Sequence, residues 1–222
     1  MIYIIQTYGS MLLRAMGQTL LLTLLSLVFA MIIGMIFALM NVGRNRVFNF
    51  IGTVYVDAVR GVPLIVLAYF IYFGVPAGIQ ALGIQGFRLP ALQAGTIALS
   101  MNCGAYMAEI IRAGIQSVDK GQMEASRSLG LSYGRSMRLV VLPQAIRTMI
   151  PSIINQFIIT LKDTSILSVI GFPELTNTGK TIMGNTFKNL QTWAIVGIMY
   201  MIVIITLSKV AKRMERRINR GR

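Results

Sequence analysis

The segment GQMEASRSLGLSYGRSMRLVVLP, residues 121–143, is polar and basic within a chain that is otherwise largely apolar. Asp119, followed three residues later by Gln122, can form a capping box that begins a helix. Gly130 can end that helix, because glycine readily adopts the left-handed conformation found at helix C-termini. The segment therefore predicts a short helix followed by a sharp turn.

A second short helix is expected after that turn, before the next apolar run begins. Ser132 can start this helix, and Pro143 suits the first turn of the helix that follows. We expect the two short helices, over about residues 119–141, to lie nearly parallel to a membrane surface. Such a pair predicts a docking surface.

The composition is that of a membrane protein. Hydrophobic residues make up 55% of the 222 residues and charged residues only 13%. Several apolar runs reach the roughly 20 residues that a membrane-spanning helix needs. We predict an all-α membrane protein with five transmembrane helices, forming a single domain over residues 1–222. The expected spans cover about residues 17–41, 50–75, 90–112, 143–170 and 190–210.

The net charge of +14 indicates either a nucleic-acid partner or a membrane, and the placement of the basic residues favours the membrane. If the N-terminus lies outside, the segments between and after the spans obey the positive-inside rule. The cytoplasmic segments then hold Arg44, Arg46, Arg112, Lys120, Arg127, Arg135, Arg138, Arg147, Lys209, Lys212, Arg213, Arg216, Arg217, Arg220 and Arg222. The outside segments hold Arg14, Arg88, Lys180 and Lys188. We predict a cytoplasmic C-terminus, and a nucleic-acid-binding tail at 209–222 is the less favoured alternative.

The residue types exclude several kinds of chemistry. The chain has no histidine, so histidine-based catalytic triads and histidine-containing zinc sites are absent. The lone Cys103 cannot form an intrachain disulfide. Residues 178–181 resemble the end of a phosphate-binding loop, but Glu174 stands where that loop needs a glycine. We therefore expect no catalytic residue, no metal and no nucleotide site in this chain.

The segment 121–143 also carries a family resemblance. The EAA motif of ABC-importer permeases has the same spacing as Glu124, Ala125, Ser126, Gly130, Val140, Leu142 and Pro143. Ser126 replaces the second alanine of the motif, and Val140 replaces the usual isoleucine. Three other segments agree with the family: RGVPLIVLAYFIYFG at 60–74, AYMAEIIRAGIQSVDKGQMEASRSLG at 105–130 and LKDTSILSVIG at 161–171. Over nearly its whole length, the chain resembles the permease subunit of a polar amino acid uptake system.

This resemblance implies the fold of a type I ABC importer permease in the bacterial cytoplasmic membrane. It implies a second permease subunit, either a copy or a relative, and an extracytoplasmic binding protein. ATPase partners would hold ATP and Mg and hydrolyse the nucleotide, so this chain would be no enzyme. The resemblance assigns ATPase coupling to Glu124, Ala125, Ser126, Gly130, Leu142 and Pro143. Without it, a loop that faces lipid headgroups would be the simpler interpretation.

Polar and charged residues within the expected spans are candidates for a substrate pathway, because ionisable groups are costly inside a membrane. Our candidates are Asp57, Asn102, Glu109, Thr160, Lys162 and Asp163. Some of these groups can instead hold helices together. Asp57 with Arg60, and Glu109 with Arg112, are three residues apart and can form local pairs. Lys162 and Asp163 are adjacent, so they point to different sides of a helix.

The candidate acids indicate a substrate class. Three carboxylates, each present twice in a dimer, would suit a basic amino acid such as arginine, lysine or histidine. Glutamine and other neutral or acidic polar amino acids stay open as alternatives. An ion-coupled secondary carrier would also have intramembrane acids, but the sequence has no inverted repeat. Gly61 and Pro63 interrupt the second expected span, either as a gate or as a packing kink.

Overall fold

The computed structural model describes residues 1–43 and 45–219, and of residues 214–219 the backbone alone. The regular elements in this part of the chain are all helices, which confirms the all-α prediction. They are α1 (Ile2–Val42), α2 (Arg46–Gly61), α3 (Leu64–Tyr69), α4 (Val75–Ala81), α5 (Ala91–Gln116), α6 (Lys120–Ser128), α7 (Tyr133–Ser136), α8 (Leu142–Asp163), α9 (Leu175–Thr186) and α10 (Asn189–Asn219). Two π turns, η1 (Phe70–Gly74) and η2 (Met137–Val141), and the 3-10 helix η3 (Thr164–Ile170) complete them. Arg44, Arg220 and Arg222, which we assigned to the cytoplasmic side, lie outside the described residues.

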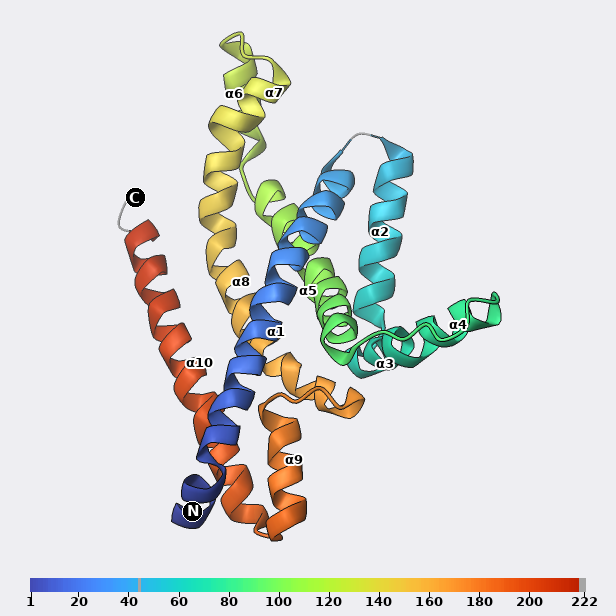
Figure 1. Cartoon of the computed structure of the whole chain (residues 1–222). Coiled ribbons are helices and arrows are strands. Elements are labelled where there is room, and N and C mark those ends of the chain that lie inside the picture. The colour runs from blue at the N-terminus through green and yellow to red at the C-terminus, as the bar shows by residue number, and fades with distance from the viewer. Residues whose placement is uncertain (44, 220–222) are drawn as a thin grey trace.

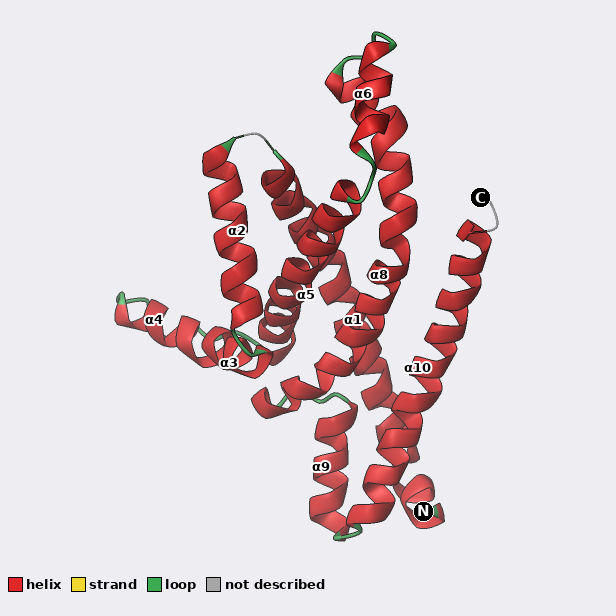
Figure 2. Cartoon of the chain, turned by 180° about the vertical axis from the view of Figure 1, so that it is seen from behind, coloured by secondary structure: helices red, strands yellow, loops and turns green. Residues whose placement is uncertain are grey.

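Helices α1, α5 and α8 cross near the middle of the molecule, with α2 on one side and α10 on the other (Figure 1). Helices α6 and α7 form a tip at the far end of α8, whereas α9 lies at the opposite end, near the N-terminus (Figures 1 and 2). Small residues let α1 and α5 pack closely: a Cβ atom at Gly104 would lie 2.7 Å from Ile33.

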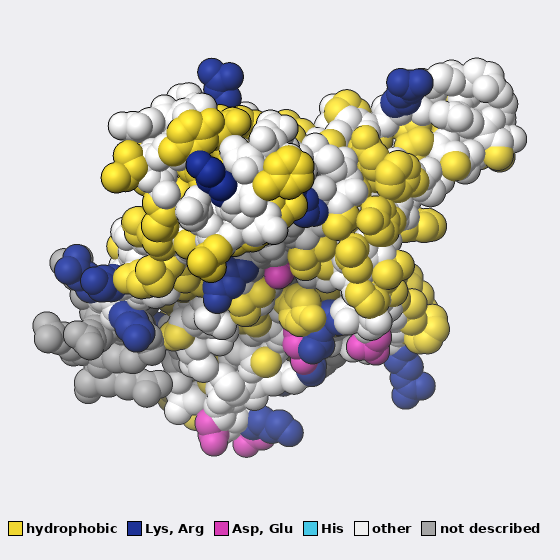
Figure 3. All heavy atoms as spheres, turned by 90° about the horizontal axis from the view of Figure 1, so that it is seen from below, with side chains coloured by type: hydrophobic (Ala, Val, Ile, Leu, Met, Phe, Trp, Pro, Cys, Tyr) yellow, Lys and Arg dark blue, Asp and Glu magenta, His cyan; other side chains and the backbone are white. Residues whose placement is uncertain are grey.

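In the part of the chain that the structure describes, four helices are long and apolar enough to cross a membrane, whereas we predicted five spans. The predicted span that is missing from these four is the third, at 90–112, which corresponds to α5. Helix α5 has 26 residues and is long enough to span a membrane. Polar residues such as Asn102 and Glu109 make α5 less apolar than the other candidates. The four candidate spans are Ile2–Val42, Leu64–Ala81, Tyr133–Ile170 and Asn189–Arg213. Apolar side chains also cover much of the face seen from the α9 end, where acidic side chains are few (Figure 3).

The predicted span at 50–75 is not one straight helix. Helix α2 ends at Gly61, and α3 begins at Leu64, so the helical conformation is interrupted at Val62 and Pro63. Proline disfavours a helical conformation in the residue before it and has no N–H to donate. The break falls where Gly61 and Pro63 predicted it, and α3 and α4 turn away from the axis of α2 (Figure 1).

The predicted helix and glycine turn are confirmed in the segment 119–130. Asp119 caps α6, because its Oδ1 accepts a hydrogen bond of 2.6 Å from the Gly121 amide. Gly130 has a φ of +86°, and the Leu131 amide donates to the Ser126 carbonyl at 3.3 Å to close the turn.

The second predicted helix begins after Ser132, as expected, but it is not separate from the span that follows. Helix α7, the π turn η2, α8 and the 3-10 helix η3 form one continuous helix over Tyr133–Ile170. The wider π turn immediately precedes Pro143, whose ring would otherwise crowd the preceding helical turn. Gln144 Nε2 donates to the Val140 carbonyl at 2.9 Å, which helps to satisfy the backbone there.

A buried carboxylate joins α9 to α10. Glu174 has no exposed surface and caps α9 by accepting hydrogen bonds from the amides of Thr176, at 2.7 Å, and Asn177, at 2.5 Å. Its Oε2 also accepts a hydrogen bond of 2.8 Å from the Tyr200 hydroxyl. Burial raises the pKa of this carboxyl, although these hydrogen bonds oppose the shift. The Leu175 amide donates to Thr19 Oγ1 at 3.1 Å, so α1 is tied to the same point.

Replacing Glu174 with alanine should therefore destabilise the protein. A lost helix cap costs roughly 0.5–2 kcal/mol, and an orphaned buried donor costs roughly 1–3 kcal/mol. We expect the melting temperature in detergent, followed by circular dichroism, to fall by about 5 °C or more. Glu174→Gln keeps one oxygen acceptor and should lose less. An unchanged melting temperature in Glu174→Ala would show that the cap does not hold α9 in place.

Candidate functional site

Two cavities adjoin one another in the space between α2, α5 and α8. The first, which we call the charged cavity, has a volume of about 380 Å³ and includes Asp57, Arg60, Glu109 and Arg112 in its lining. The second, the amide cavity, has a volume of about 500 Å³ and includes Arg60, Asn102, Tyr106, Gln156 and Asp163. Arg60 lines both, so the two cavities meet at this side chain.

Helix α2 is amphipathic, and its polar face forms one wall of the charged cavity. Asn49, Thr53, Asp57 and Arg60 recur every three or four residues and therefore share one face of the helix. The large apolar side chains of α2 are exposed on other faces: Val47, Phe48, Phe50, Ile51 and Val54.

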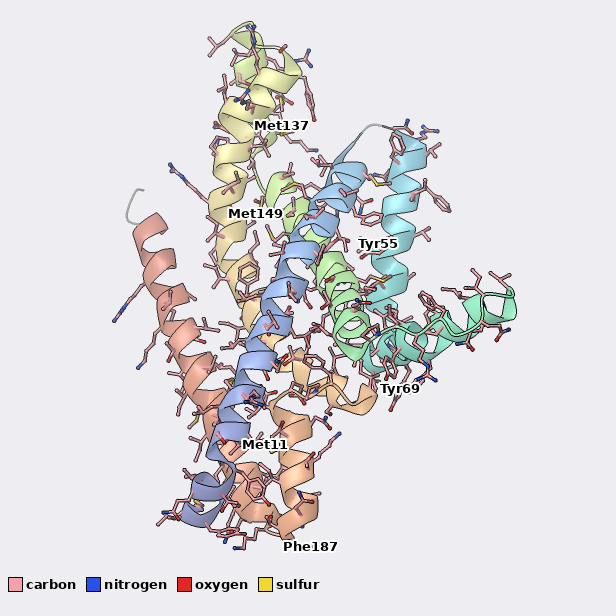
Figure 4. The ribbon with its side chains drawn as sticks, viewed as in Figure 1. Met11, Tyr55, Tyr69, Met137, Met149 and Phe187 are labelled. Carbon is pink, nitrogen blue, oxygen red and sulfur yellow. The ribbon has the colours of Figure 1, made fainter. Side chains whose placement is uncertain are left out.

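Tyr55 holds α2 against its neighbours. Its hydroxyl donates to the Met101 carbonyl of α5 at 2.9 Å, and its ring stacks on Phe37 of α1, with the ring centroids 3.8 Å apart (Figure 4). These contacts orient the polar face of α2 towards α5.

Glu109 and Arg112 form the ion pair that their spacing predicted. Arg112 donates from Nη2 to Glu109 Oε1 at 2.5 Å and from Nε to Oε2 at 3.1 Å. Arg112 Nη1 also donates to Gln116 Oε1 at 2.8 Å. Bidentate pairs of this kind are geometrically specific, so the Glu109 carboxylate is largely committed to its own helix.

Asp57 and Arg60 do not form the other predicted pair. The only ion pair among the described side chains is that of Glu109 with Arg112. The Arg60 guanidinium instead lies over the Tyr106 ring, 5.2 Å from its centroid. Spacing predicted that Arg60 neutralises Asp57, whereas the structure places Arg60 where the two cavities meet.

The amide cavity gathers residues from α5 and α8. Asn102 and Gln156 are 8% and 6% exposed, so each amide is buried within the cavity wall. Asp163 follows Gln156 by seven residues, which places both on nearly the same face of α8. Lys162, which we predicted to line the pathway, is exposed and lines neither cavity, because it points to a different side of α8 from Asp163.

Thr160 lies behind the cavity wall. It is 1% exposed, and its Oγ1 lies 2.9 Å from the Gln156 carbonyl and 3.2 Å from Cys103 Sγ. Its contacts join α8 to α5, so in this structure it supports the wall.

The residues of the EAA motif differ in accessibility. Glu124, Ala125 and Pro143 are exposed, and Leu142 is partly buried. Ser126 is only 5% exposed and donates from Oγ to the Met123 carbonyl at 2.9 Å, so it faces its own chain. The small size of Ser126 lets α6 pack against η2.

Leu129 is an exposed apolar residue at the same tip. It is 85% exposed and ends α6 immediately before the Gly130 turn. Sequence reasoning missed it because an isolated leucine near a loop carries no signal of exposure.

Comparison with known proteins identifies the family. Residues 8–220 match the family described as binding-protein-dependent transport system inner membrane component. The glutamine transport system permease protein GlnP of Escherichia coli strain K12 is 36% identical over 207 residues, covering 93% of this chain and 92% of that protein. The arginine transport system permease protein ArtQ of Bacillus subtilis strain 168 is 33% identical over 206 residues, covering 93% and 91%.

Solved structures agree with this assignment. A chain of an amino acid ABC transporter crystallised with histidines is similar with a TM-score of 0.89 and 38% identity, and the match covers 96% of each chain. The MetNI methionine ABC transporter is similar in fold, with a TM-score of 0.79 and 21% identity over 95% of this chain and 97% of that chain. The predicted resemblance is thus confirmed, and the chain belongs to the family of binding-protein-dependent transport system inner membrane components.

Proposed function

We propose that this chain is the permease subunit of an ATP-driven importer of polar amino acids, in which it forms the pathway through the bacterial cytoplasmic membrane. The observation that carries the proposal is the pair of polar cavities that meet at Arg60. Polar cavities between apolar helices are costly unless a polar solute or water uses them. In this proposal the four apolar helices and α5 span the membrane, and the placement of the basic residues supports an outside N-terminus and a cytoplasmic C-terminus.

The amide cavity suits the part that all amino acids share. Asp163 offers a carboxylate for the substrate ammonium, and Arg60 offers a guanidinium for the substrate carboxylate. Asn102 and Gln156 add amide groups for a polar side chain. The charged cavity, which extends to Asn41 near the end of α1, forms the next stage of the pathway.

A basic side chain is the first candidate for the transported amino acid. Asp57 and Asp163 line the two cavities, and neither is in an ion pair with a described residue. Similarity to the arginine permease and to the transporter crystallised with histidines supports the same class.

Glutamine is the second candidate. Arg112 is already paired with Glu109. The amide cavity is lined by one positive charge, on Arg60, and one negative charge, on Asp163. A substrate with no net charge therefore fits as well. Similarity to the glutamine permease of Escherichia coli supports this candidate.

The tip formed by α6 and α7 is the proposed docking surface for the ATPase subunit, which binds ATP and Mg. Glu124, Ala125, Pro143 and Leu129 offer exposed contacts, while Gly130 and Leu142 set the shape of the tip. A second permease subunit and an extracytoplasmic binding protein complete the assembly, and hydrolysis belongs to the ATPase rather than to this chain.

The test is ATP hydrolysis by the chain reconstituted in vesicles with a candidate ATPase subunit and a candidate binding protein, with each amino acid offered in turn. Stimulation by arginine, lysine or histidine alone would select the first candidate, and stimulation by glutamine the second. Asp163→Asn should reduce stimulation about tenfold or more, because a hydrogen bond to a charged group contributes about 1.5–3 kcal/mol. If no amino acid stimulates hydrolysis in an assembled complex, the proposed function is wrong.

A further inference from the structure

A third cavity lies between α8 and α10 and shares no residue with the proposed pathway. Its volume is about 170 Å³, roughly ten times the space that one water molecule needs. Three polar side chains line it: Asn155 from α8, with Ser208 and Lys212 from α10. Nothing in the proposed transport function uses these residues.

The remaining walls of this cavity are apolar. Pro151, Ile154 and Ile158 come from α8, and Ala211 comes from α10. The cavity therefore combines an apolar lining with three hydrogen-bonding side chains. This combination matches a molecule with an anionic group attached to a hydrocarbon chain.

The position of the cavity along α10 places the donors near the membrane surface. Lys209, Lys212 and Arg213 directly follow the long apolar stretch of α10 and form its basic end. That end meets the lipid headgroups whichever way the chain is oriented. The C-terminal half of α10 also diverges from α8 in both views (Figures 1 and 2).

The surroundings of α10 are apolar enough for lipid chains. Met201, Ile202, Ile205 and Val210 are all exposed, and α10 is the least buried of the four candidate spans. No acidic side chain among the described residues lines the cavity, so an anion there meets no repulsion from its walls. Basic pockets between membrane helices bind the headgroups of anionic lipids.

We propose that the cavity between α8 and α10 binds the phosphate headgroup of an anionic phospholipid. Lys212 supplies the positive charge, Ser208 and Asn155 donate hydrogen bonds to phosphate oxygens, and the apolar wall holds the first part of an acyl chain. A lipid bound there joins α8, which continues into the α6–α7 tip, to α10.

The chain offers a matched pair of variants for the test. Lys212→Gln removes the charge that lines the cavity, whereas Lys209→Gln removes an exposed charge three residues away that does not line it. Ala211→Leu fills the cavity without changing any charge. Circular dichroism melting of each variant would establish that it is folded.

The measurement is native mass spectrometry of the full chain titrated with phosphatidylglycerol or with phosphatidylcholine. We expect a retained phosphatidylglycerol adduct whose affinity falls about tenfold or more in Lys212→Gln, because a charged hydrogen bond is lost. Ala211→Leu should weaken it similarly, and Lys209→Gln should change it by no more than about fivefold.

Three results would overturn the proposal. Equal losses of lipid affinity in both lysine variants would mean that basic residues attract the lipid to the surface in general. Equal binding of the two lipids would mean that the site does not distinguish an anionic headgroup from a zwitterionic one. Displacement of the adduct by millimolar inorganic phosphate would assign the site to free phosphate. Disappearance of the adduct on formation of a permease dimer would mean that a second copy covers the cavity.

Discussion

Replacing Gly130 with valine should reduce amino-acid-stimulated ATP hydrolysis in the reconstituted importer about tenfold or more. Gly130 has a φ of +86°, and a β-branched residue is strained there by roughly 1–3 kcal/mol. Nothing lies within 4 Å of a Cβ atom built at this position, so the effect comes from backbone strain and not from a clash. The turn relieves that strain by unwinding, which moves α6 and its exposed Glu124 and Leu129 relative to α8.

Gly83 provides the matched control for this substitution. It has a φ of +94°, its Cβ position is also open, and it lies in the connection between α4 and α5, away from the tip. Gly83→Val should therefore carry similar strain without disturbing the docking surface. If both variants lose stimulation equally, or if Gly130→Val retains it, the Gly130 turn does not transmit nucleotide-driven movement.

Local signals predicted the fold well where the residues act on their immediate neighbours. The Asp119 cap and the Gly130 turn were recognised because each depends on a few adjacent residues. The continuity of α7 with α8 was missed, because it depends on a π turn that accommodates Pro143, and no simple spacing rule signals such a turn.

The number of apolar spans shows a limit of hydropathy. Helix α5 is central and largely buried by other helices, so its surface need not be as apolar as that of a helix facing lipid. Three polar residues lower the mean hydropathy of α5 and line the two cavities: the buried Asn102, Glu109 and Arg112. We predicted five spans and the structure has four candidate spans. The helix that makes the difference is α5, whose polar side chains line both cavities.

In the candidate site too, contacts within one helix were easier to predict than contacts between helices. The Glu109–Arg112 pair was predicted correctly from its helical spacing, whereas Asp57 and Arg60, which have the same spacing, do not pair. The contact of Arg60 with Tyr106 joins α2 to α5 and depends on how the helices pack, which one sequence does not show. A guanidinium that stacks on a ring leaves its edge free to bind a carboxylate.

Replacing Arg60 with glutamine should lower the rate of amino acid uptake at limiting substrate about tenfold or more. Arg60 is the one residue that lines both the charged cavity and the amide cavity, and it lies 5.2 Å from the Tyr106 ring centroid. Glutamine can still donate a hydrogen bond, but it cannot provide the charge-assisted contact with a carboxylate that contributes about 1.5–3 kcal/mol. The measurement is uptake of radiolabelled amino acid into vesicles over a range of concentrations.

Arg88 supplies the control, since it is exposed and lines neither cavity. Arg88→Gln removes the same charge from the chain, so any general effect of net charge on membrane insertion or assembly would lower uptake in both variants. A loss confined to Arg60→Gln, with ATP hydrolysis still present in the absence of substrate, places the defect in the pathway rather than in docking. Because Arg60 joins the two cavities, that loss should also persist for every transported amino acid, whereas a residue that reads the side chain would alter the ranking among them. Unchanged uptake in Arg60→Gln would mean that the substrate carboxylate passes the junction without this guanidinium.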